Sequence, residues 1–114
     1  MLERKGKVTM QLKDFIKTTI KYIQDPGHGW LVVPLSVISE LGIANKISSC
    51  SYYNKNMAYL EEDCDAGVFL EALKEQLNIT YKDLFIMEQH QDAYSVIRTY
   101  KSFADMPCIT ELLG

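Results

Sequence analysis

The segment Gly27-His28-Gly29 is the first place in this sequence where a side chain could do chemistry. Backbone amides next to glycine can approach a ligand closely, and successive amides can form a nest that binds an anion. The imidazole between them could take part in binding or proton transfer near neutral pH. The alternative, which we favour, is a tight hairpin turn whose histidine points into solvent. Gly27, His28 and Gly29 are therefore the first candidate ligand-binding residues.

Four carboxylates lie within five residues, at Glu61, Glu62, Asp63 and Asp65. Hard cations such as Mg²⁺ and Ca²⁺ bind oxygen ligands of this kind. Side chains alternate along a strand, however, so the four cannot all reach one ion unless the chain turns. The run also lacks the spacing and central glycine of an EF-hand loop. We therefore predict no metal site. Asp63 or Asp65 is expected to cap the next helix, with Glu61 and Glu62 solvated.

A second polar group, His90, Arg98 and Tyr100, lies in the last third of the chain. An arginine fork and a histidine can hold a carboxylate or a phosphate, and these residues could form one pocket with His28, Glu61 and Asp63. The alternative that we favour is a structural ion pair between Arg98 and Glu61 or Asp63. The chain has no G-x-S-x-G, H-E-x-x-H, C-x-x-C or G-x-x-x-x-G-K-[ST] motif, so common hydrolase, metalloprotease, redox and nucleotide-binding functions lack support.

Two strands and a turn should position His28. From Ile16 to Gln24 β-favouring residues dominate and alternate between two faces, which predicts a strand. The segment 25–29 combines aspartate, proline and two glycines that can adopt positive φ, which is typical of a turn. Residues 30–33 then predict the hairpin partner of the first strand. Trp30 begins this partner strand, and we expect its side chain to be buried.

The rest of the chain predicts a small α+β fold. The expected elements are a helix over 35–41 that Gly42 ends, a hairpin of strands 51–53 and 57–60, a helix over 66–77, a strand over 84–87, and a helix or strand over 94–103. These elements indicate a small antiparallel sheet of two hairpins plus a further strand, packed by one main helix and one or two short helices. Residues 1–14 are interpreted as a terminal arm and 15–114 as a single domain.

Composition limits the classes of function. The chain of 114 residues is 47% hydrophobic, with a net charge of −3, so no nucleic-acid partner is expected. No apolar run is long enough for a membrane span and the first residues lack a signal-peptide pattern, so we expect a cytoplasmic protein without a membrane partner. No motif predicts a cofactor. Cys50, Cys64 and Cys108 have no metal-site spacing and are interpreted as free thiols that act as small buried apolar residues.

Several sequence blocks together resemble a known family. They are PGHGW at 26–30, VP at 33–34, LGIANKIS at 41–48, YLEEDCDA at 59–66 and IRTY at 97–100. In this order they are similar to the small GHGW and LEEDCDA proteins of bacterial genomes, plasmids and phages, and the likeness covers roughly residues 22–103. The resemblance implies an accessory protein of mobile elements. It supplies no set of catalytic residues.

Two classes of function follow from these observations. The first is a non-catalytic binding protein that acts on a host or mobile-element protein, such as a defence component, because the chain is acidic and has seven tyrosines, a residue common at interfaces. The alternative is an enzyme or sequestering protein for a small phosphorylated ligand, with a pocket of His, Asp, Glu and Arg side chains. Regulatory DNA binding is the weakest class, because no basic helix is visible beyond the first residues.

Overall fold

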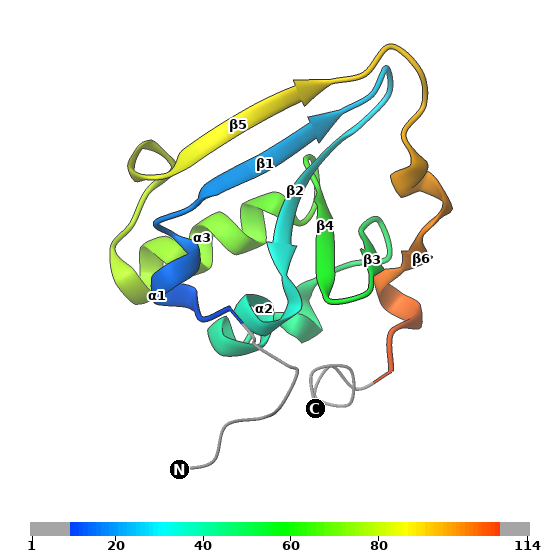
Figure 1. The fold of residues 1–114 in the computed structure, drawn as a ribbon. Helices are drawn as coiled ribbons and strands as arrows, with labels where there is room; N and C mark the ends of the chain where they lie inside the picture. Colours follow the sequence, from blue (N-terminus) through cyan, green and yellow to red (C-terminus); the bar gives the residue numbers. More distant parts are fainter. Residues whose placement is uncertain (1–9, 108–114) are drawn as a thin grey trace.

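A six-stranded mixed sheet forms the centre of the computed structural model, which describes residues 10–107 (Figure 1). Its strands are β1 (Thr19–Gln24), β2 (Gly29–Pro34), β3 (Tyr52–Asn54), β4 (Met57–Glu61), β5 (Phe85–His90) and β6 (Lys101–Ser102). They lie in the order β5-β1-β2-β4-β3-β6. The described α-helices are α1 (Leu12–Phe15), α2 (Leu35–Leu41) and α3 (Ala66–Leu77), and short 3₁₀ helices lie between and after these elements. The predicted α+β class is confirmed.

The sheet is not purely antiparallel, and this corrects the prediction. β1 pairs with β2, β2 with β4 and β4 with β3 in antiparallel fashion, but β5 runs parallel to β1 from Thr19↔Phe85 to Gln24↔His90. β4 and β5 therefore point the same way, and a parallel connection needs a long crossover, which α3 supplies. Nothing in the short apolar run at the start of β5 reveals its direction, so the sequence pattern could not distinguish the two pairings.

The main core lies on one face of the sheet, under α2 and α3. Leu31, Val33 and Leu60 point to this face and belong to the same buried cluster as Phe69 and Leu73 of α3. Helix α3 has the predicted bounds. Phe69 and Leu73 are buried, Leu70 is partly buried, and Leu77 at its end is 42% exposed. None of the described helices is long and apolar enough to cross a membrane.

The first helix changes the predicted start of the domain. The strand expected from residue 16 begins only at Thr19, because Leu12–Phe15 form α1 and bury Leu12 and Phe15 against the core. The Glu40 carboxylate accepts a hydrogen bond of 2.8 Å from the backbone amide of Leu12 and fixes this helix. The packed domain thus begins before residue 15, and residues 1–9 of the predicted arm lie outside the described part.

The opposite face of the sheet carries a smaller buried group. Trp30 is 1% exposed, as predicted, but it lies outside the main core cluster together with the buried Ile97. The segment 94–103, predicted as a helix or a strand, is neither as a whole: it forms a short 3₁₀ helix, η3 (Val96–Thr99), and then β6. This segment, drawn in orange in Figure 1, brings Arg98 to within 5.7 Å of the Trp30 ring centroid.

Candidate functional site

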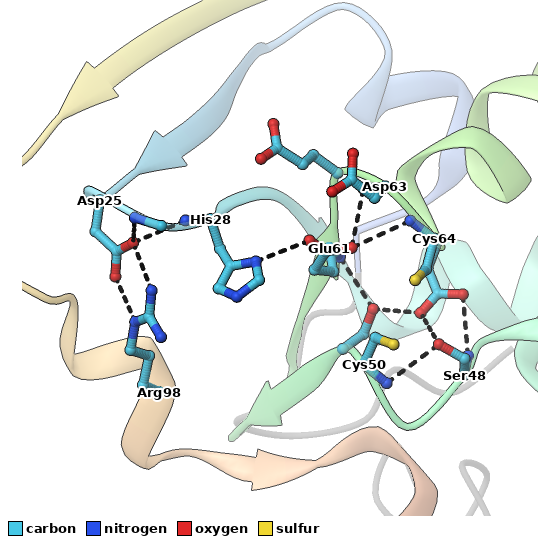
Figure 2. A network of polar contacts seen from close by, with 12 residues as sticks. Asp25, His28, Ser48, Cys50, Glu61, Asp63, Cys64 and Arg98 are labelled. Carbon is cyan, nitrogen blue, oxygen red and sulfur yellow. Dashed lines mark hydrogen bonds and ion pairs between the residues drawn. The ribbon is translucent and has the colours of Figure 1, made fainter.

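Asp25 is the centre of the polar network around the first turn (Figure 2). Its side chain is fully buried and accepts hydrogen bonds from the amides of Gly27 and His28 at 3.0 Å each and from the amide of Ser95 at 2.9 Å. Arg98 donates two more, from Nε at 2.6 Å and from Nη2 at 2.9 Å. The Arg98 guanidinium and these amides hold the pKa of the Asp25 carboxyl well below its usual range, against the opposing effect of burial.

This network assigns different roles to the residues that the sequence singled out. The amides of Gly27 and His28 do form an anion nest, but Asp25 of the same chain fills it. Arg98 pairs with Asp25, and not with Glu61 or Asp63 as predicted. The reason is topological: the chain from the end of β5 to η3 returns beside the β1–β2 turn, where Gln91 donates its amide to the Gln24 carbonyl.

The two glycines of the turn are needed for space and not for positive φ. Among the described glycines only Gly42 has a positive φ, of 72°. A Cβ atom on Gly27 would lie 2.8 Å from Nη2 of Arg98, and one on Gly29 would lie 2.2 Å from the hydroxyl of Tyr22. Gly27 therefore lets the Arg98 fork reach Asp25, and Gly29 lets the Tyr22 ring lie across β2.

Glu61 is buried and internally bonded, although it was predicted to be solvated. Its Oε2 lies 3.1 Å from Nδ1 of His28, and its Oε1 accepts the amides of Asp63 at 2.9 Å and of Cys64 at 3.1 Å. β4 places it directly opposite Trp30 of β2, next to the turn that carries His28. The Glu61 carboxylate thus stabilises the turn between β4 and α3.

Asp65 precedes α3 but does not cap it with its side chain, which corrects the prediction of a side-chain cap. The buried carboxylate turns away and accepts hydrogen bonds from the amide of Ser48 at 3.0 Å, the hydroxyl of Ser48 at 2.8 Å and the hydroxyl of Ser51 at 2.5 Å. The Ser51 hydroxyl oxygen in turn accepts the amide of Glu61 at 3.0 Å (Figure 2). Asp65 therefore ties the loop before β3 to the end of β4.

Glu61, Glu62 and Asp63 have the spacing of a cation site. One carboxylate oxygen from each lies within 4.8 Å of the others. Both oxygens of Glu61 are already engaged, however, and Glu62 accepts a short hydrogen bond from the Tyr22 hydroxyl. A cation at this point would have to compete with these partners, so the arrangement gives no separate indication of a metal.

The structure does not bring the other candidates into the network. His90 is 67% exposed at the end of β5 and lies 3.5 Å from Glu88, on the face opposite His28. Tyr100 packs against Tyr59 with 5.0 Å between ring centroids, and burial raises the pKa of Tyr59. The predicted pocket residues thus do not converge as a set: His28 contacts Glu61, Arg98 pairs with Asp25, and His90 lies beside Glu88.

The exposed part of the site is aromatic. The Arg98 guanidinium lies over the Tyr94 ring, 4.4 Å from its centroid, while Tyr94 itself is 72% exposed and Val96 is 62% exposed. We call His28, Tyr94, Val96 and Arg98 the Tyr94 surface. Tyrosine and arginine, with tryptophan, are enriched among the residues that dominate binding energy at protein interfaces.

Sequence reasoning missed Asp25 and Tyr94. An aspartate before Pro-Gly commonly accepts hydrogen bonds from the amides two and three residues ahead, so two of the five hydrogen bonds to Asp25 had a readable signal. No sequence signal indicated its pairing with Arg98, which lies 73 positions away. The cysteine prediction is also wrong in part, since Cys50 and Cys64 are free but exposed; Cys108 lies outside the described residues.

Comparison of the chain with known protein families, with curated proteins and with solved structures found no match.

Proposed function

We propose that this chain is a non-catalytic binding module of the GHGW and LEEDCDA type, which acts in the cytoplasm on a host or mobile-element protein such as a defence component. The Tyr94 surface is the proposed contact region. The observation that carries the proposal is an exposed tyrosine ring stacked on an arginine that a buried carboxylate holds in place.

This arrangement favours binding because it is preorganised. A free arginine side chain has many rotamers, and its immobilisation at an interface has an entropic cost. Asp25 fixes both Nε and Nη2 of Arg98 before any partner arrives, and Arg98 in turn supports the Tyr94 ring. The large contact area of the ring is therefore available at a reduced entropic cost.

The same contacts weigh against a catalytic site or a phosphate site. A phosphate would need the Arg98 fork or the amides of Gly27 and His28, and Asp25 already accepts hydrogen bonds from all of them. Glu61 likewise uses both carboxylate oxygens inside the fold. An enzyme or sequestering protein for a phosphorylated ligand is therefore the less favoured alternative.

Site-specific photocrosslinking in the native host tests the proposal. A photoreactive phenylalanine analogue is introduced at Val96 and, as the matched control, at Leu77, an exposed apolar residue at the end of α3. We expect a discrete protein adduct from position 96 that Tyr94→Ala abolishes and that position 77 does not give. Identical adducts from both positions, or an adduct insensitive to Tyr94→Ala in a folded variant, would contradict this assignment.

A further inference from the structure

A cavity of about 300 Å³ lies beside β1 on the face that α3 covers. Leu31 and Leu70 contribute apolar walls, Tyr22 and Tyr81 contribute aromatic rings, and Glu62 and Glu88 contribute carboxylates. Its volume is at the lower end of the range of small-molecule sites, which are mostly apolar with a few placed polar groups. This Tyr22 cavity is separate from the Tyr94 surface, because Tyr22 and Leu31 face one side of the sheet and Trp30 faces the other.

The charged side chains that line the cavity are all acidic. Glu62 and Glu88 line it, and no lysine, arginine or histidine does. The Tyr22 hydroxyl donates to Oε2 of Glu62, and burial together with the Glu62 contact raises the pKa of Tyr22, so the phenol stays protonated as the donor. Within residues 10–107 no donor is bonded to Oε1 of Glu62, so this oxygen can accept a hydrogen bond from a ligand in the cavity.

Gly29 keeps this geometry in place. The Tyr22 ring lies so close to β2 that a Cβ atom at position 29 would meet its Cζ at 2.6 Å. β1 also sets Tyr22 directly beside Glu88 of β5, and the β4–α3 turn brings Glu62 to the Tyr22 hydroxyl. Aromatic rings, a free carboxylate oxygen and a second carboxylate thus come from three separate parts of the fold to one cavity.

We propose that the Tyr22 cavity binds an alkylammonium group, from a small free amine or from a lysine side chain. Glu62 and Glu88 would accept hydrogen bonds from the ammonium and offset its charge. The rings of Tyr22 and Tyr81 would attract the cation, and Leu31 and Leu70 would contact the alkyl chain. An anion would be repelled by both carboxylates, and a neutral alcohol would not offset their charge. Outside the cavity lining, His90 lies 3.5 Å from Glu88, whereas Glu62 contacts the neutral Tyr22 hydroxyl.

Titration of the full chain with n-butylammonium, followed by amide NMR, tests this proposal. We expect saturable shifts at Tyr22, Leu31 and Ala66, none of comparable affinity with 1-butanol or butyrate, and binding at least about tenfold weaker in Glu62→Gln. Glu75→Gln, a matched charge removal on the exposed side of α3, should bind as the parent does. Nα-acetyl-lysine methylamide distinguishes the sources: equal binding indicates that a protein lysine is accepted, and weaker binding indicates a free amine.

Three results would overturn the proposal: no saturable binding of either amine, equal binding of butanol, or equal loss in Glu62→Gln and Glu75→Gln. Glu62→Gln retains an acceptor for the Tyr22 hydroxyl and is expected to fold, and Glu88→Gln supplies a second variant if it does not. The proposal does not rest on the Tyr94 surface, so either can fail without the other.

Discussion

Replacement of Asp25 by alanine is the sharpest test of the network at the first turn. The change removes the acceptor of five hydrogen bonds, three from backbone amides and two from Arg98. Loss of one partner of a buried ion pair typically costs about 3 to 5 kcal/mol, because the other charge stays behind. Domains of this size have a free energy of unfolding of about 5 to 15 kcal/mol, so Asp25→Ala should remove a large part of it.

The measurement is urea unfolding of the parent and Asp25→Ala at several pH values. The pKa of the Asp25 carboxyl is lower in the folded chain than the unfolded value of about 3.9, so its stabilisation is fully present above that value. As pH falls below about 4 the unfolded carboxyl takes up a proton first, and the stabilisation declines. The difference between the two proteins should therefore be largest near neutral pH and shrink in acid.

The double variant Asp25→Ala/Arg98→Ala tests whether the uncompensated charge of Arg98 causes the loss of stability in Asp25→Ala. If the unpaired, partly buried guanidinium left behind is the main cost, the double variant should be less destabilised than the sum of the two single variants. A loss below about 1 kcal/mol for Asp25→Ala, or a difference that does not change with pH, would refute the assignment of Asp25 as the centre of the site.

Three further predictions concern the neighbouring elements. Trp30→Ala should cost about 3 to 5 kcal/mol, as large aromatic truncations in a core do, and an unchanged melting temperature would exclude its burial. Gly29→Ala should destabilise the fold by about 1 to 3 kcal/mol, because the added Cβ would clash with Tyr22. A Cβ at Gly67 of α3 would meet nothing within 4 Å, so Gly67→Ala should be neutral or stabilising by up to about 1 kcal/mol. Melting curves of the two variants provide the comparison. Addition of Mg²⁺, Mn²⁺ or Ca²⁺ should leave the melting temperature unchanged, and a rise that Glu61→Ala abolishes would show a metal site instead.

Local chemistry made much of the fold predictable. The helix over 35–41 ends at Gly42 in the left-handed conformation, as its sequence indicates, and α3 has the predicted bounds. The turn at 25–29 forms where its residues indicate, although its two glycines provide space for Arg98 and Tyr22 and do not adopt positive φ. In each case the residues that determine the structure lie within a few positions of one another, so a single sequence contains the signal.

The features that the sequence did not predict all depend on contacts between segments that are distant in the chain. Asp65 was a good N-cap by local rules, but its carboxylate instead accepts hydrogen bonds from the hydroxyls of Ser48 and Ser51, which lie 17 and 14 positions away. Glu61 appeared in a polar run typical of solvent, yet the end of β4 lies under the β1–β2 turn and buries it. Tertiary pairing overrode local preference at both positions, and no pattern within the run could indicate it.

The GHGW and LEEDCDA segments become one structural unit when β2 and β4 pair. Trp30 lies opposite Glu61, the Gly29 carbonyl accepts the amide of Glu62 at 2.9 Å, and His28 contacts Glu61. On the other face, the Tyr22 ring lies over Gly29 and its hydroxyl donates a hydrogen bond to Glu62. Glu61 and Glu62 are neighbours in the sequence but contact residues on opposite faces of the sheet, because side chains alternate along a strand. In this chain the two segments depend on each other, because the Glu61 carboxylate and the Glu62 amide find hydrogen-bond partners at His28 and Gly29.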